Sequence, residues 1–224
     1  MNKKLTKIKN YMYYDKKMMR RMFVDMFNFL KQRFDFKCNF FTFVCGIWSL
    51  VICPLILYAP KDVFVEDGWI ENLQLLFLVC TLIISYTATT DKKFFMFVGL
   101  LVILMLMRET NLGRYYFCEK YLSSDVACKW KNLKYGYFAE ILRWGFGLYT
   151  IYFAWINRLY LNFINYVKST QIFFWDILFV FLGALGGSMA ELHFIDNEIM
   201  EEASELLFYL AFTNCVWRYS RLKI

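Results

Sequence analysis

The sequence has few prolines, glycines and histidines, and each shortage excludes a class of protein. Two prolines and ten glycines in 224 residues are too few for a disordered or low-complexity chain. The single histidine, His193, excludes a three-histidine zinc site and a di-iron centre that needs two Glu-x-x-His motifs. Seven cysteines without a CxxC pair exclude a zinc ribbon and a thioredoxin motif.

Apolar residues dominate the composition instead. Hydrophobic residues make up 59% of the chain and aromatic residues 21%, and the mean hydropathy is +0.38. These values exceed those of ordinary soluble domains, and they predict an all-α fold, a polytopic transmembrane helix bundle in the lipid bilayer. A single transmembrane domain, 39–224, is expected to hold about six spans, near residues 39–58, 69–89, 94–107, 137–156, 172–189 and 202–217.

The first 38 residues form a separate basic and aromatic segment. Apolar residues between Met18 and Phe34 recur at helical spacing, with lysines and arginines mostly on the other side. That pattern is typical of an amphipathic helix lying on an anionic membrane surface. A solvated basic leader that only fixes orientation is the alternative. No compact apolar core with a cleavage site lies near the start, so we expect no cleavable signal peptide.

The placement of lysine and arginine predicts the orientation. With the N-terminus inside, eighteen of these residues fall on inner segments and seven on outer segments, which favours both termini in the cytoplasm. The net charge of +7 then reflects membrane topology, and we expect no nucleic-acid partner. On the outer side, Cys118 and Cys128 either form a disulfide or remain thiols.

Acidic residues gather where two of the spans begin. Two polar triplets share the spacing i, i+4, i+7, which places each triplet on one face of a helix. These are Asp67, Glu71 and Gln74, and then Glu198, Glu202 and Glu205. In the predicted topology, both triplets and the Arg108–Glu109 corner fall on the outer side. We therefore expect a carboxylate-lined site that opens outward between helices.

Carboxylates at such close range cannot all stay ionised without a cation or basic partners. We expect a metal ion, a shared proton or an arginine network at this site. If a metal binds, a carboxylate-rich site with one imidazole suits a hard divalent cation, Mg²⁺, Ca²⁺ or Mn²⁺. Its candidate ligands are Asp67, Glu71, Glu198, Glu202, Glu205 and His193.

Three classes of function fit this site. A metal-assisted enzyme would act on a lipid or envelope precursor, with catalytic roles for Glu71, Glu109 and Glu202. In that enzyme, Arg108 and Arg114 would bind an anionic lipid or the anionic part of the precursor. A cation- or proton-coupled transporter would use the same carboxylates. A non-catalytic interaction or immunity protein would present them to a partner, so the pattern leaves open whether the chain is an enzyme.

A purely structural interpretation explains part of the same pattern. The helix macrodipole favours acidic residues at helix N-termini, and both triplets lie at helix starts. His193 alone is more readily explained as an interfacial histidine than as a ligand. Elsewhere, Gly183 and Gly187 predict a close contact between helices. Asp176 is expected to reach the inner interface or to pair with a basic group.

The order of motifs resembles a group of small bacterial integral membrane proteins. That group combines an E-D-G-x-x-E helix entry, an R-E-x-x-x-G-R corner and a late glutamate-rich helix start. The matching residues are Glu66-Asp67-Gly68 with Glu71, Arg108-Glu109 with Gly113-Arg114, and Glu201-Glu202 with Glu205. The resemblance implies a multi-pass fold in the bacterial cytoplasmic (inner) membrane, and it implies no particular chemistry.

Overall fold

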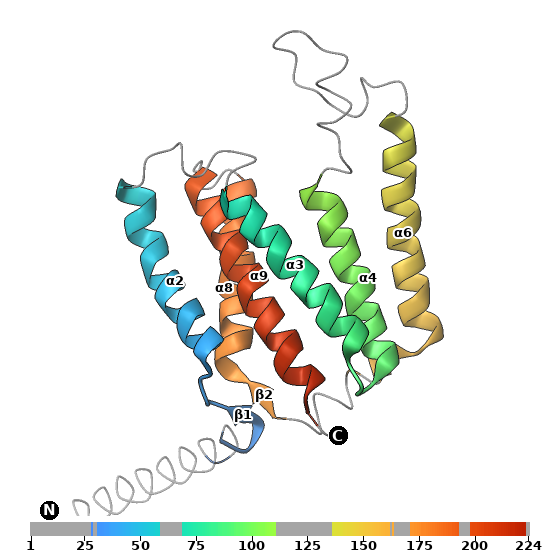
Figure 1. Cartoon of the computed structure of the whole chain (residues 1–224), viewed down its shortest axis with the longest axis horizontal. Coiled ribbons are helices and arrows are strands. Elements are labelled where there is room, and N and C mark those ends of the chain that lie inside the picture. The colour runs from blue at the N-terminus through green and yellow to red at the C-terminus, as the bar shows by residue number, and fades with distance from the viewer. Residues whose placement is uncertain are drawn as a thin grey trace, which may run out of the picture.

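The computed structural model describes residues 28, 31–58, 69–110, 136–161, 163, 171–192 and 198–222. Within these ranges the chain is mostly helical, as expected for an all-α fold (Figure 1). The helices, in chain order, are α2 (Phe40–Tyr58), α3 (Trp69–Thr87), α4 (Lys92–Glu109), α6 (Gly136–Ile156), α8 (Phe174–Glu191) and α9 (Glu198–Ser220). Two strands of two residues each pair in parallel, and sequence had not predicted them: β1 (Phe34–Asp35) and β2 (Ile172–Phe173).

Each of these helices begins and ends within a few residues of a predicted span. The largest difference concerns α9, which was expected over 202–217 but begins at Glu198 and continues to Ser220. The helix α4 was expected over 94–107 but begins at Lys92 and continues to Glu109. The Asp91 side chain caps its start by accepting a hydrogen bond from the Phe94 amide at 3.2 Å. The extension matters because Arg108 and Glu109 lie in the last turn of α4 rather than in the following loop.

Length and hydropathy single out α3 as the one described helix able to cross a membrane. Two neighbouring helices contain shorter apolar segments, Phe40–Ile52 in α2 and Phe174–Ala190 in α8. Charged residues at both ends of α4 and at the start of α9 lower the hydropathy of those helices. Two of these polar ends, the end of α4 and the start of α9, also carry the candidate site.

The helix α9 lies at the centre of the bundle and packs against α8, α3 and α2 (Figure 1). Three apolar clusters surround it, and each contains residues of α9. Tyr209 belongs to one cluster with Leu78 and Phe95, Leu207 to a second with Cys45 and Phe179, and Leu206 to a third with Ile70. By contrast, α6 packs mainly against α4 and exposes most of its large side chains. The position of α9 therefore determines where polar residues of different helices meet.

The contact between α8 and α9 is close enough to require glycine. A Cβ atom added at Gly183 would lie 2.6 Å from the backbone nitrogen of Phe208, and one added at Gly186 would lie 2.9 Å from Cβ of Ser204. The prediction for Gly183 is thus confirmed. Gly186, rather than the predicted Gly187, makes the second close approach. A Cβ atom added at Gly187 would lie 3.5 Å from Glu205 Cγ, which is an ordinary van der Waals distance.

The end of the basic N-terminal segment packs against the bundle. The carbonyl oxygen of Phe36 accepts a hydrogen bond from Nε1 of Trp175 at 3.1 Å, and β1 pairs with β2 just before α8 begins. Residues 28 and 31–33 are helical. Phe34, the last residue of the predicted amphipathic helix, lies in β1 instead because it pairs with Ile172 of β2, and the rest of that predicted helix lies outside the described residues. The last residues of the segment 1–38 are therefore part of the helical domain.

Replacing Gly183 tests the α8–α9 contact. We expect Gly183→Ala to lower the free energy of unfolding by about 1–3 kcal/mol, because the added Cβ meets backbone that cannot rotate away. Gly147→Ala in α6 is the matched control, since a Cβ there would meet no atom within 4 Å. Alanine's helix propensity is expected to leave that variant unchanged or stabilise it by up to about 1 kcal/mol. Unfolding of the purified protein in detergent measures both, and equal losses would contradict the close contact.

Candidate functional site

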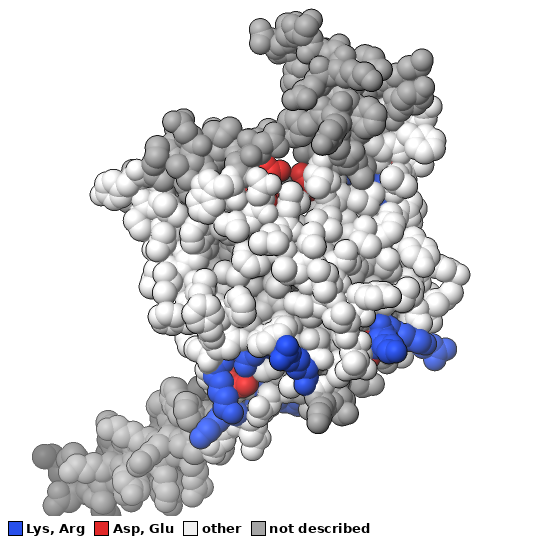
Figure 2. Space-filling view, in the orientation of Figure 1, with Lys and Arg blue, Asp and Glu red and all other residues white. Residues whose placement is uncertain are grey.

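Polar side chains from three helices meet at one end of the bundle. The start of α3, the end of α4 and the start of α9 lie together there (Figure 1). Figure 2 shows Asp and Glu atoms at this end and most Lys and Arg atoms at the opposite end. We call the group at this end the carboxylate cluster; its described members are Glu71, Gln74, Arg108, Glu109, Glu202, Glu205 and Tyr209.

Gln74 joins α3 to the first turns of α9. Its side chain is fully buried, and its Nε2 donates hydrogen bonds to Oε2 of Glu202 at 2.9 Å and to the Glu202 carbonyl oxygen at 3.1 Å. The amide oxygen, Oε1, is also buried but has no hydrogen-bond partner. An unpaired buried acceptor costs about 1–3 kcal/mol of stability. Turning the amide over would not help, because its oxygen would then face the Glu202 carboxylate.

Arg108 and Tyr209 hold the two carboxylates on the other side of the cluster. Nη2 of Arg108 lies 2.7 Å from Oε1 of Glu205, and its Nε lies 3.9 Å from Oε1 of Glu109. The Tyr209 hydroxyl donates to the same Glu109 oxygen at 2.6 Å. The arginine side chain is 55% exposed, whereas the Glu109 and Glu205 side chains are 9% and 14% exposed. This side of the cluster is therefore internally paired.

The structure brings together most predicted site residues that it describes. Glu71 lies one turn before Gln74 in α3, is half-buried, and interacts electrostatically with Glu202. Glu109, Glu202 and Glu205 occupy neighbouring positions as expected. The remaining candidates, Asp67, Arg114 and His193, lie outside the described residues, and so does the side chain of Glu198, whose backbone begins α9.

The expected metal ligands do not form a metal-binding group within the described part of the chain. No three His, Cys, Asp or Glu side chains there are arranged to share an ion. The contacts give the reason: Glu205 is paired with Arg108, and one oxygen of Glu202 accepts from Gln74. The arginine network that was the alternative to a metal is present, at least around Glu205 and Glu109.

Tyr209 is the member of the cluster that sequence reasoning missed. It follows Glu202 by seven residues and Glu205 by four, so all three lie on one face of α9. Extending the polar triplet by one further turn would have found it. The tyrosine hydroxyl matters because it donates a hydrogen bond to a carboxylate without adding a positive charge.

A second polar group, the Asp176 network, lies at the opposite end of the bundle, near the C-terminal end of α9. Asp176 is fully buried; its Oδ2 lies 2.8 Å from Nη1 of Arg218, and its Oδ1 accepts from Thr42 at 2.6 Å and from Asn214 at 2.9 Å. Asn39 adds a hydrogen bond to Asn214 at 2.8 Å. The expectation that Asp176 pairs with a basic group is confirmed, and Arg218 is that group.

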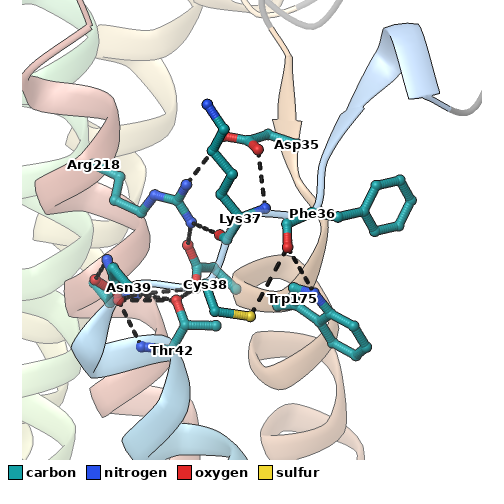
Figure 3. Close-up of polar contacts among 10 residues, drawn as sticks. Asp35, Phe36, Lys37, Cys38, Asn39, Thr42, Trp175 and Arg218 are labelled. Carbon is teal, nitrogen blue, oxygen red and sulfur yellow. Dashed lines mark hydrogen bonds and ion pairs between the residues drawn. The ribbon is translucent and has the colours of Figure 1, made fainter.

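Arg218 extends this network to the N-terminal segment (Figure 3). Its Nη2 lies 3.3 Å from Oδ2 of Asp35, its Nη1 donates to the Lys37 carbonyl at 3.2 Å, and its guanidinium carbon lies 3.6 Å from the centre of the Phe173 ring. Both oxygens of Asp176 are thus paired, and the side chains tie α2, α8, α9 and β1 together. A fully satisfied network of this kind serves structure rather than ligand binding.

Comparison with known proteins adds no assignment. The chain matches no protein-family model, no curated protein and no solved structure. The resemblance to the group of bacterial proteins with E-D-G-x-x-E and R-E-x-x-x-G-R motifs therefore stays a prediction.

Arg218→Met tests the Asp176 network. Removing the guanidinium leaves a buried carboxylate without its counter-charge, and we expect the free energy of unfolding to fall by about 3–5 kcal/mol. Arg221→Met is the matched control, because Arg221 is exposed and lies over the Trp217 ring at 4.6 Å, a contact worth about 1 kcal/mol or less. Thermal unfolding in detergent measures both variants. A loss in Arg218→Met no larger than in Arg221→Met would contradict the structural role of the network.

Proposed function

We propose that this chain is an integral protein of the bacterial cytoplasmic membrane. In this proposal, α2, α3, α4, α6, α8 and α9 cross the bilayer, with both termini in the cytoplasm and the carboxylate cluster on the outer side. The shortest of these helices has 18 residues and the longest 23, which gives about 27–35 Å at about 1.5 Å per residue. That range suits a hydrocarbon core about 30 Å thick.

The exposed surface supports a lipid environment. Large apolar side chains on several helices are exposed, among them Leu50 (77%), Trp144 (73%) and Trp155 (72%). Apolar patches on this scale are rare on soluble monomers. The segregation of charge supports the proposed orientation, because the lysines and arginines gather at the end that would face the cytoplasm.

For the carboxylate cluster, we propose binding of the polar group of a lipid or envelope precursor at the outer leaflet. The observation that carries this proposal is the convergence of polar groups from three helices on a patch rich in acceptors. Five described carboxylates interact electrostatically at this end, and the ion pairs of Arg108 reach two of them, Glu205 and Glu109. Glu109 and Glu205 are paired with Tyr209 and Arg108. Glu202 accepts a hydrogen bond from Gln74 through Oε2 and interacts electrostatically with Glu71, so we infer that this pair of carboxylates attracts the positive part of a ligand.

Metal-assisted catalysis by Glu71, Glu109 and Glu202 has less support than simple binding. A hard cation takes several oxygen ligands, and the described residues form no group of three or more acidic, histidine or cysteine side chains that could share one ion. Arg108 remains the candidate for the anionic part of the precursor, because its half-exposed guanidinium lies at the rim of the cluster.

Cation- or proton-coupled transport is a second candidate, and one observation favours it. Gln74, Thr81 and Ser85 are all buried along one face of α3, so the polar residues of this helix form a row that continues inward from the cluster. Thr81 Oγ1 lies 2.7 Å from Oγ1 of Thr213 on α9. However, each hydroxyl also lies within hydrogen-bond distance of a carbonyl oxygen of its own helix, at 2.8 Å for Thr81 and 2.7 Å for Thr213, which is an ordinary structural use of buried threonine.

The proposed topology can be tested with one helix. Thr110 and Lys92 lie at opposite ends of α4, and both are exposed. In a background without native cysteines, we expect a membrane-impermeant maleimide to label Thr110→Cys in intact cells and Lys92→Cys only after permeabilisation. The reverse pattern would place the carboxylate cluster in the cytoplasm. Equal labelling of both variants in intact cells would argue against a membrane-spanning α4.

Elemental analysis separates ligand binding from metal-assisted catalysis. We expect purified wild-type protein and Glu202→Gln, after equilibration with Mg²⁺, Ca²⁺ or Mn²⁺, to retain the same small amount of each ion. The reason is that Glu202 is not part of a described metal-binding group. One ion per wild-type chain, lost in Glu202→Gln, would contradict simple binding and restore the metal-assisted mechanism.

A further inference from the structure

The buried amide oxygen of Gln74 points to the chemistry of the ligand. Buried acceptors in folded proteins are nearly always paired, yet Gln74 Oε1 has no partner while both hydrogen bonds from Nε2 go to Glu202. The amide cannot exchange its two ends without placing two acceptors face to face. The missing partner must therefore be a hydrogen-bond donor.

Among the residues that the structure describes, no side chain supplies that donor. Glu202 and Glu71, when ionised, only accept hydrogen bonds. The Tyr209 hydroxyl donates to Glu109, and Nη2 of Arg108 donates to Glu205. The described side chains around the Gln74 amide therefore offer acceptors. Glu71 and Glu202 are half-buried, whereas Gln74 is fully buried, so the two carboxylates are the more accessible of the three groups.

We propose that Gln74, Glu202 and Glu71 form a subsite for a primary ammonium group. This inference rests on the proposed function, because it names the positive part of the ligand bound at the carboxylate cluster. A primary ammonium carries one positive charge and three N–H donors, one for each of the three side chains. It reaches the cluster either as the head group of an aminophospholipid or as a free amine.

Two other cations fit this subsite less well. A hard metal ion requires several oxygen ligands directed at one point, and the described residues show no such group. A quaternary ammonium has no N–H and is recognised by aromatic faces, so it would leave Gln74 Oε1 unpaired. The subsite is therefore expected to select a cation by its number of N–H donors as well as by its charge.

Titration of the purified full chain in detergent tests the proposal with ethylammonium chloride as the probe. We expect ethylammonium to bind and to raise the thermal unfolding midpoint, and tetramethylammonium at the same concentration to have no effect. Gln74→Met keeps the side-chain length but removes the carbonyl acceptor, and we expect it to weaken ethylammonium binding at least about tenfold. Ser85→Ala is the control, because Ser85 Oγ is likewise buried and unpaired in α3 but belongs to a later turn; its affinity should be unchanged.

Equal binding of ethylammonium and tetramethylammonium, or wild-type affinity in Gln74→Met, would overturn the proposal. If Gln74→Met does not fold, Glu202→Gln serves as the test, since loss of the anion should also weaken ethylammonium binding. Nanodiscs identify the source of the amine. If a lipid supplies the ammonium group, phosphatidylethanolamine should compete with ethylammonium and phosphatidylglycerol should not. If a free amine supplies it, neither lipid should compete with ethylammonium.

These results remain separable from the fate of the proposed function. If labelling places Thr110→Cys in the cytoplasm but ethylammonium still binds in detergent, the outer-leaflet assignment is wrong and the ammonium subsite is retained. Conversely, correct topology combined with equal binding of both ammonium ions would retain the membrane protein and reject the ammonium subsite.

Discussion

The buried ion pair between Asp176 and Arg218 ties α2, α8, α9 and β1 together. Burying a carboxylate destabilises the folded protein unless the group is ion-paired and hydrogen-bonded. Here the Arg218 guanidinium, Thr42 and Asn214 supply three such contacts. Those partners come from α2 and α9, while Asp176 itself begins α8. One charge therefore fixes three helices relative to each other, and Asp35 adds the N-terminal segment to the same guanidinium.

That constraint reaches the candidate site through α9. Arg218 and Asn214 set the position of one end of this helix, and the glycines of α8 let its middle approach within backbone contact. The other end carries Glu202, Glu205 and Tyr209 at fixed heights against α3 and α4. A shift of α9 along its axis would separate Glu202 from Gln74. The geometry of the carboxylate cluster is thus a consequence of helix packing.

Apolar length and helical periodicity were sufficient to predict where the six described helices lie in the sequence. The distribution of lysine and arginine was sufficient to predict that the acidic groups of α3, α4 and α9 lie at one end of the bundle. The details that decide chemistry were not predictable in the same way. Pairings such as Arg108 with Glu205 or Asp176 with Arg218 join distant parts of the chain, so spacing along one helix does not reveal them. The β1–β2 pair is too short to produce an alternating pattern. The unpaired oxygen of Gln74 is visible only once both neighbouring helices are placed.

The proposed subsite places an ammonium nitrogen against Gln74 and Glu202 in the carboxylate cluster. Solid-state NMR measures this directly, through the dipolar coupling between ¹⁵N-labelled ethylammonium and ¹³C-labelled side-chain carbonyl carbons in the reconstituted protein. Hydrogen bonds of ordinary length place the nitrogen within about 4 Å of both carbons. We expect a coupling to each of these two residues. Bound ethylammonium that couples to neither would contradict this placement.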